Sequence, residues 1–179
     1  WIQAQVTNEG LINIEESITI ANSGTTFTDT AGTINVAAGK VLTVSEGTTE
    51  LGAGTVLTGD GLFDLAGTHT LNLASDLTLP STGQQLSFSG SVTVNGPGKL
   101  FNDTVLNLIN DTINVDVTNS NLLTLGNTTI NADVTNSGTL LVYGNSVING
   151  TLTTTATSII RLEGNSTYGR SYLTVANGL

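Results

Sequence analysis

A three-residue pattern, apolar–polar–apolar, recurs along almost the whole of this 179-residue chain. In an extended segment, such a triplet places its two apolar side chains on one face and its central side chain on the other. A single triplet is too short to be stable, so the recurrence predicts that successive copies lie side by side. The central residues of nine such triplets are Asn13, Asn35, Glu50, Asn72, Ser87, Asn107, Thr124, Val142 and Arg161.

The spacing of the triplets differs between the two halves of the chain. Between Asn35 and Ser87 the steps alternate between long and short, which predicts a double unit of about 37 residues. Beyond residue 100 the steps become nearly equal, and a segment that begins with Asn recurs at 110–114 (NDTIN), 127–131 (NTTIN) and 145–149 (NSVIN). We therefore expect coils of uneven size, in which the corners absorb the differences in length.

This translational repetition predicts an all-β chain that forms one domain over residues 1–179, a single right-handed parallel β-helix (β-solenoid) of about nine coils. No segment shows the 3.6-residue period of a helix. An antiparallel sandwich is the rival fold, but its hairpin turns would have to join mirror-related strands, which turn dipeptides such as Asn95-Gly96 and Asn149-Gly150 do not. The pattern leaves a two-sided and a three-sided coil equally open.

The composition fits short strands joined by tight corners, with 32 Thr, 19 Asn and 21 Gly. The net charge of −10 and the four scattered basic residues argue against nucleic acid as a partner. No apolar run approaches the roughly 18 residues of a membrane helix, so we expect no membrane insertion. There is no Cys, which excludes disulfides and thiolate metal sites.

Segments such as 31–44 (AGTINVAAGKVLTV) and 136–145 (NSGTLLVYGN) resemble the degenerate repeats of large bacterial surface adhesins, namely filamentous-haemagglutinin-like proteins and autotransporter passenger domains. The resemblance covers nearly the whole chain and concerns the style of the repeat. It implies secretion, a β-helix fold and a role in attachment or surface display. It brings no catalytic residues with it.

The carboxylates are the first candidates for site chemistry. Asp116 and Asp133 are 17 residues apart and are expected to stack on adjacent coils, where two like charges would repel unless they shared a cation such as calcium. A solvated outer face is the alternative that we favour, with no metal bound. His69, the only histidine, has no evident catalytic partners and is expected at a solvated corner or on a strand face. We therefore expect no enzyme activity and no cofactor.

The most regular polar feature is a column of Asn110, Asn127, Asn145 and Asn165, which we interpret as a structural ladder because Asn tolerates left-handed corners and stacked amides can hydrogen-bond. Five Asn residues also fit the Asn-X-Ser/Thr acceptor pattern for glycosylation. Three of the five belong to the column, which leaves Asn102 and Asn149 as the candidates. An ice-binding threonine array would need outward Thr residues in strict register, whereas Thr124 is expected to align with Val142 and Arg161.

Both ends of the chain read as strand without a cap, which predicts either a segment of a longer chain or subunits that stack end to end. The leading expectation is an extracellular structural or adhesive stalk segment of a large secreted surface protein. The alternatives are a self-assembling filament subunit and a β-helix that binds or cleaves polysaccharide. The partners expected are other copies of the chain or glycans of a host or surface.

Overall fold

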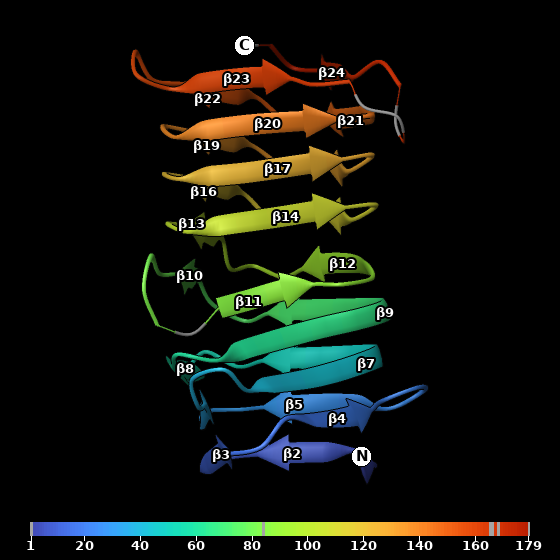
Figure 1. The fold of residues 1–179 in the computed structure, drawn as a ribbon, viewed down its shortest axis with the longest axis vertical. Coiled ribbons are helices and arrows are strands. Elements are labelled where there is room, and N and C mark those ends of the chain that lie inside the picture. Colours follow the sequence, from blue (N-terminus) through green and yellow to red (C-terminus); the bar gives the residue numbers. More distant parts are fainter. Residues whose placement is uncertain (1, 84, 165–166, 168, 179) are drawn as a thin grey trace.

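The computed structural model describes residues 2–83, 85–164, 167 and 169–178, and these residues form 24 strands and no helix. All strand pairs are parallel, and the strands stack into a rod with the two termini at opposite ends (Figure 1). The near strands β14 (Val105–Ile109), β17 (Leu122–Gly126) and β20 (Thr139–Tyr143) run from left to right as the chain climbs. The coil is therefore right-handed, and the predicted fold class is confirmed.

Most coils contain three strands, one on each side. The strands of the first half are β1 (Ile2–Gln3), β2 (Val6–Asn8), β3 (Leu11–Ile14), β4 (Ile18–Ala21), β5 (Thr26–Asp29), β6 (Thr33–Val36), β7 (Val41–Leu51), β8 (Val56–Gly59), β9 (Leu62–Leu73), β10 (Leu77–Leu79), β11 (Gln85–Phe88) and β12 (Ser91–Asn95). Besides β14, β17 and β20, those of the second half are β13 (Leu100–Asn102), β15 (Thr112–Ile113), β16 (Val117–Asn119), β18 (Thr129–Ile130), β19 (Val134–Asn136), β21 (Asn145–Ile148), β22 (Leu152–Thr154), β23 (Ile159–Leu162) and β24 (Tyr172–Val175).

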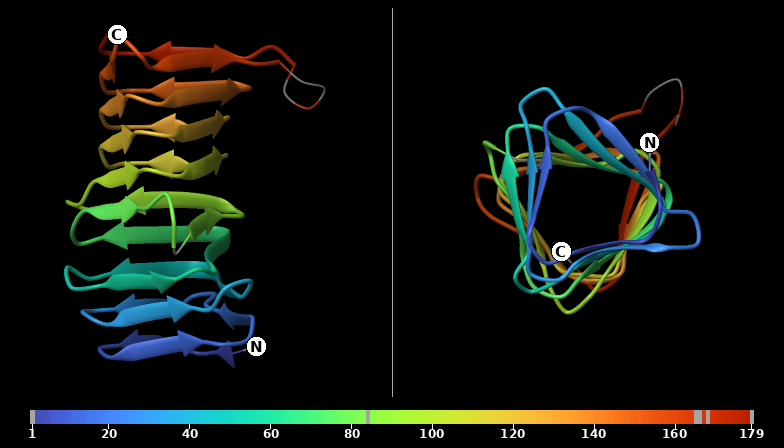
Figure 2. Two further views of the ribbon diagram at one scale, coloured as in Figure 1. Left: turned by 60° about the vertical axis from the view of Figure 1, so that its left-hand side comes forward. Right: turned by 90° about the horizontal axis from the view of Figure 1, so that it is seen from below.

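The strands form four sheets, and the largest runs the whole length of the rod in the order β1-β4-β7-β9-β12-β15-β18-β21-β24. In the second half, the sheets β10-β13-β16-β19-β22 and β14-β17-β20-β23 form the other two sides. The cross-section there has three sides, and the view along the axis shows the coils superposed around a closed interior (Figure 2). The path gives about eight turns, close to the nine coils expected.

The core is a set of apolar columns that run from coil to coil. Leu106, Leu123 and Leu140 occupy paired positions on adjacent coils, and none of them is more than 1% exposed. Where the coils are wider, aromatic rings fill the interior, and the rings of Phe27 and Phe63 lie 6.1 Å apart. Alternation of inward apolar and outward polar residues therefore builds the core in both halves, as the triplets predict.

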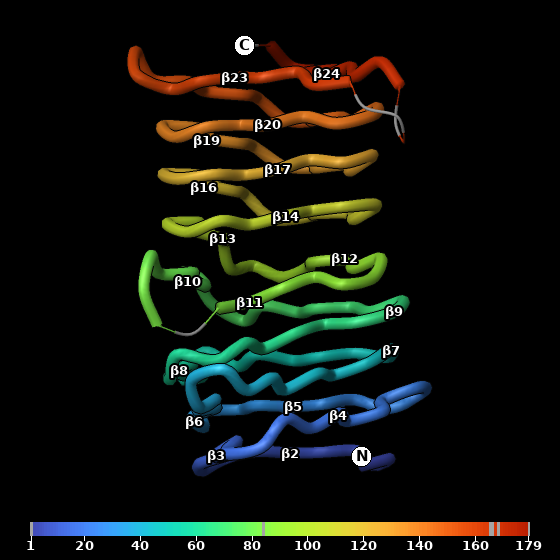
Figure 3. The backbone as a smooth tube through the Cα atoms, viewed as in Figure 1, coloured from blue at the N-terminus to red at the C-terminus, as the bar shows by residue number. Residues whose placement is uncertain are grey.

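The predicted 37-residue double unit is wrong. Asn35 lies between Asn13 and Thr58, whereas Glu50 pairs with Asn72 on a different side of the coil. The cause is the length of β7 and β9, which span 11 and 12 residues, bend around a corner and each carry two triplets. Counting one triplet per coil therefore grouped together triplets that lie on different sides of the rod. Figure 3 shows the backbone path around the coils.

Candidate functional site

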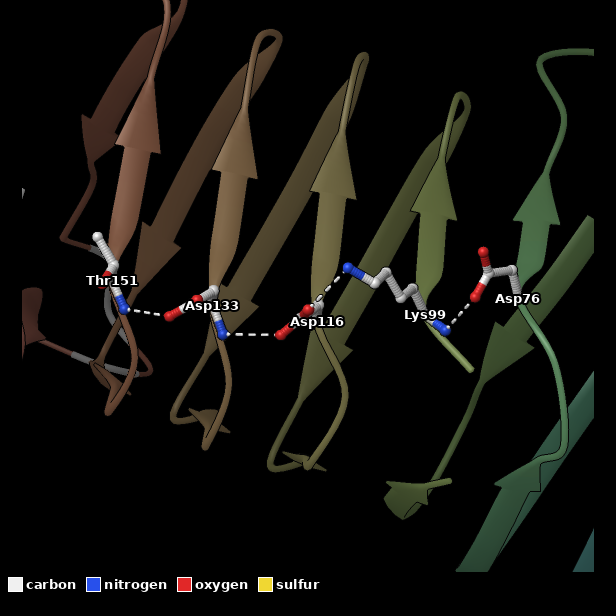
Figure 4. Close-up of polar contacts among 5 residues, drawn as sticks. All are labelled: Asp76, Lys99, Asp116, Asp133 and Thr151. Carbon is white, nitrogen blue, oxygen red and sulfur yellow. Dashed lines mark hydrogen bonds and ion pairs between the residues drawn. The ribbon is translucent and has the colours of Figure 1, made fainter. Parts of the chain in front are cut away.

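Five residues form a column at the corner that precedes the sheet β10-β13-β16-β19-β22, one on each of five successive coils (Figure 4). We call this column the acidic file; its members are Asp76, Lys99, Asp116, Asp133 and Thr151. It contains Asp116 and Asp133, the two carboxylates that the sequence predicts to stack. The structure confirms that they lie on adjacent coils, since the neighbouring Val117 and Val134 are paired.

Carboxylate oxygens of the acidic file accept hydrogen bonds from the backbone of the next coil. The backbone N–H groups of Lys99, Asp133 and Thr151 donate to Oδ1 of the preceding file member, over 2.9, 3.3 and 2.7 Å respectively. The Lys99 ammonium also lies 3.1 Å from Oδ2 of Asp116. Lys99 offsets the charge of one of the three carboxylates, and the hydrogen bonds join neighbouring corners.

This arrangement gives a physical reason for the stacked carboxylates that requires no calcium. Oδ1 of both Asp116 and Asp133 already accepts an N–H, and Lys99 faces the remaining oxygen of Asp116. Within the described residues, no group of three or more His, Cys, Asp or Glu side chains gathers as metal ligands would. The acidic file is therefore suited to joining coils rather than to holding a cation.

The predicted Asn column is only partly confirmed. Asn110 and Asn127 adopt left-handed backbone angles, with φ of 62° and 52°. On the next coil the left-handed position belongs to Gly144 (φ 63°), and Asn145 begins β21 with an exposed side chain. Asn165 lies outside the described residues. The stacked amides expected in this column are replaced by one contact, from the backbone N–H of Asn145 to Oδ1 of Asn127 over 3.0 Å.

Two other columns of Asn residues do form amide ladders. The inner ladder comprises Asn102, Asn119 and Asn136, which are buried, and each Nδ2 of the first two donates over 2.7 Å to Oδ1 of the next. The outer ladder lies along the largest sheet and runs in the opposite sense, because each Nδ2 donates to Oδ1 of the preceding member over 2.7–3.2 Å; its members are Asn72, Asn95, Asn114, Asn131 and Asn149. A Val-Thr-Asn triplet at 117–119 and 134–136 is the sequence signal for two of the three inner positions, whereas Asn102 follows Leu100-Phe101.

The ladders change the interpretation of both glycosylation candidates. Asn102 was expected to point outward, but it is 0% exposed, and its Nδ2 donates to Asn119 Oδ1 and to the Leu122 carbonyl. A glycan at Asn102 would have to displace the core, so this prediction is wrong. Asn149 is exposed at the end of the outer ladder, with its Nδ2 engaged by Asn131.

His69 is buried rather than solvated at a corner or on a strand face. It is 2% exposed, and its Nε2 lies 2.9 Å from Oγ1 of Thr49. Burial lowers the pKa of the imidazole from 6.5 to about 4, although a backbone hydrogen bond at Glu46 opposes the shift. The imidazole is therefore neutral at physiological pH and packs as an uncharged polar side chain inside the rod.

A second buried titratable group, Asp111, lies on the largest sheet where the two halves of the rod meet. It is 2% exposed and accepts hydrogen bonds from the backbone N–H groups of Val92 and Ile109, both over 2.7 Å. Burial nevertheless raises the pKa of the carboxyl to about 7. On the next two coils, Thr128 and Ser146 take the same inward corner position with neutral hydroxyls.

Thr124 was expected to align with Val142, but it pairs with Leu141, which in turn pairs with Arg161. That side of the rod therefore has no threonine array, in agreement with the expectation. Within the described part of the chain, no helix has the length and apolar character needed to cross a bilayer. No protein-family model, curated protein or solved structure matches the chain.

Proposed function

We propose that the chain is a rigid stalk or adhesive segment of a large extracellular bacterial surface protein, with a non-enzymatic role. The observation that carries this proposal is the set of hydrogen-bonded files that run along the axis. The acidic file and the two amide ladders join coil to coil through side chains, in addition to the backbone bonds of the sheets.

Such files suit a load-bearing rod. Each hydrogen bond contributes only about 0.5–1.5 kcal/mol net, but the files act in parallel at different corners of the same coil. Pulling the coils apart along the axis would break several of them together with the backbone ladder. A stalk that holds a binding surface away from a cell benefits from this arrangement.

The surface chemistry also fits exposure to the extracellular medium. The charged fraction is 10%, and Thr, Asn and Gly dominate, which resembles the adhesin repeats described above. The partners that this surface favours are uncharged polar ones, such as glycans or further copies of the rod. The net charge of −10 disfavours nucleic acids and anionic membranes.

The proposal is tested by labelling intact cells of the source organism with an antibody raised against residues 1–179. We expect labelling without permeabilisation, and loss of the label after brief treatment of intact cells with protease. An antibody to a cytoplasmic protein serves as the control for leakage. Labelling that appears only after permeabilisation would rule out the surface location.

A further inference from the structure

The outward side of the largest sheet carries a column of threonines in register. This hydroxyl file consists of Thr26, Thr48, Thr70, Thr93, Thr112 and Thr129, paired in that order from coil to coil. Their hydroxyls make no side-chain hydrogen bond within the described residues, and the residues that follow them point into the core. A continuous line of free hydroxyls therefore faces solvent.

The outer amide ladder runs beside the hydroxyl file, two residues further along each strand. An Asn side chain has two N–H donors and two acceptor lone pairs. Where an Asn of the outer ladder has a neighbour on both sides, the ladder uses one N–H and one lone pair of its side chain. The remaining donor and acceptor stay available. Four successive coils thus present one hydroxyl and one amide with free hydrogen-bonding capacity, repeated about every 4.8 Å along the rod, namely Thr70 with Asn72, Thr93 with Asn95, Thr112 with Asn114 and Thr129 with Asn131.

A hollow of about 660 Å³ opens on the other side of the hydroxyl file. Thr68, Ser89, Ser91 and Asn110 line it, together with the apolar side chains of Phe88 and Ile109, and one carboxylate, that of Glu46, lies at its edge. Thr68 and Ser91 precede Thr70 and Thr93 by two residues, so they point to the same side of the sheet. The hollow is therefore a widening of the same polar surface.

Charge and shape restrict what this surface can bind. From Thr68 to Asn149 the two files contain no ionisable group; Glu46, which lines the hollow, and Glu50, which accepts from Asn72, are the carboxylates nearest to them. The two files together are only about 7 Å wide and about 24 Å long. That area is far below the roughly 800 Å² per partner of a stable protein interface, which argues against a second copy of the chain. A single extended polymer matches both dimensions.

We propose that the hydroxyl file, the outer amide ladder and the hollow together bind a linear, uncharged, hydroxyl-rich polysaccharide that lies along the axis of the rod. Sugar hydroxyls both donate and accept hydrogen bonds, as the Thr and Asn groups do. The polymer meets the same pair of groups on four successive coils, so weak contacts add through multivalency. This inference rests on the proposed adhesive function and names its ligand class.

The test measures depletion of the purified chain by insoluble neutral polysaccharides (cellulose, chitin and β-1,3-glucan), with alginate as the anionic comparison. The variant Thr93→Val/Thr112→Val/Thr129→Val removes three hydroxyls and keeps the shape and strand propensity. The control is Thr118→Val/Thr135→Val/Thr153→Val, three outward threonines in register on the neighbouring sheet. We expect salt-independent binding to one neutral polymer, weakened at least tenfold in the first variant and unchanged in the control.

Several results would overturn the inference. These are binding to no neutral polymer, binding to alginate alone, equal loss in both variants, adsorption to ice in place of polysaccharide, and self-association abolished by the first variant. Short oligosaccharides should compete at least tenfold more weakly than the polymer, and equal competition would contradict binding along the file. Surface labelling of cells is a separate result, so a surface-exposed chain that binds no glycan overturns this inference alone.

Discussion

The two halves of the rod differ in the side-chain hydrogen bonds that join one coil to the next. In the second half the coils are nearly equal, and hydrogen bonds within the inner and outer ladders join residues 17 or 18 positions apart. In the first half the side-chain contacts that join coils span 20–26 residues, and Asn–Asn pairs such as Asn13 with Asn35 occur beside mixed pairs. Asn8 there meets Asp29, and Thr49 meets His69.

The difference shows that the apolar columns tolerate replacement of one residue type by another, whereas the amide ladders do not. Leucine, isoleucine, valine and phenylalanine can replace one another in a column, and longer corners simply bulge outward. An amide ladder needs the same residue at the same corner in every coil, because a hydrogen bond tolerates little change of distance or direction. A ladder therefore depends on the residue type at each corner rather than on coil length, since the outer ladder continues over steps of 23, 19, 17 and 18 residues.

The halves meet at a break in one side of the rod. Strand β11 pairs only with β9, and β14 pairs only with β17, so no backbone ladder joins β11 to β14. On the other two sides β12 pairs with β15 and β10 with β13. The core is continuous across the break, but the side between β11 and β14 lacks the hydrogen bonds found elsewhere.

The largest expected effect on stability comes from removing an aromatic side chain from the wide core of the first half. Phe63 is 0% exposed and packs against Phe27, so Phe63→Ala should lower the free energy of unfolding by about 4 kcal/mol. Phe63→Leu, which keeps most of the volume, should lower it by about 1 kcal/mol. Denaturant unfolding followed by circular dichroism measures both, and equal losses would show that the first half is not close-packed.

Removing one member of the inner ladder tests the second half. Asn119 bonds to Asn102, Asn136 and the Thr139 carbonyl, so Asn119→Ala should cost about 3 kcal/mol by leaving buried polar groups unpaired. The matched control, Asn131→Ala in the exposed outer ladder, should cost less than about 1 kcal/mol because water replaces the lost bonds. If both variants lose the same stability, the ladders do not differ as described.

The pH dependence of stability separates the two buried titratable groups. The pKa of Asp111 is raised to about 7, so its folded state binds the proton more tightly and its contribution to stability falls as the pH rises from about 4 to 7. The pKa of His69 is lowered to about 4, so its contribution rises between about pH 4 and 6.5. The two slopes oppose each other, each with a limit of about 1.4 kcal/mol per pH unit.

The opposing slopes predict a nearly flat stability profile for the unaltered chain between about pH 4 and 6.5. His69→Gln should leave a stability that falls with rising pH, and Asp111→Asn should leave one that rises. Urea midpoints at several pH values provide the measurement. Flat profiles in both variants would mean that neither group titrates differently in the folded and unfolded states.

The smallest effect is expected in the acidic file. Asp133→Ala removes the acceptor for the Thr151 N–H at an exposed corner and should cost less than about 1 kcal/mol. Millimolar calcium should leave the melting temperature of the chain unchanged, because the file already satisfies its carboxylates. A rise in melting temperature with calcium that disappears in Asp133→Ala would restore the shared-cation interpretation.

Much of the fold follows from the sequence, because the triplets encode the inward and outward faces directly. The register of the second half also follows, since the equal steps bring Asp116 beside Asp133. The register of the first half does not, because bent strands carry two triplets and nothing in a triplet tells which side of the coil it occupies. The burial of His69 depends on that register and so was missed as well. Asn102 was missed for another reason: it lies two residues after the buried Leu100, so the alternation of faces turns a polar side chain inward.

The central claim is that the irregular first half is the same solenoid as the second, with Asn35 stacked on Thr58 and not on Glu50. The chain has no native Cys, so two double variants can be compared by disulfide trapping. Paired residues on neighbouring parallel strands lie about 4.8 Å apart, within the range that a disulfide bridges. Asn35→Cys/Thr58→Cys should form an intramolecular disulfide on mild oxidation, and Asn35→Cys/Glu50→Cys should remain reduced. A disulfide in the second variant and none in the first would contradict the account.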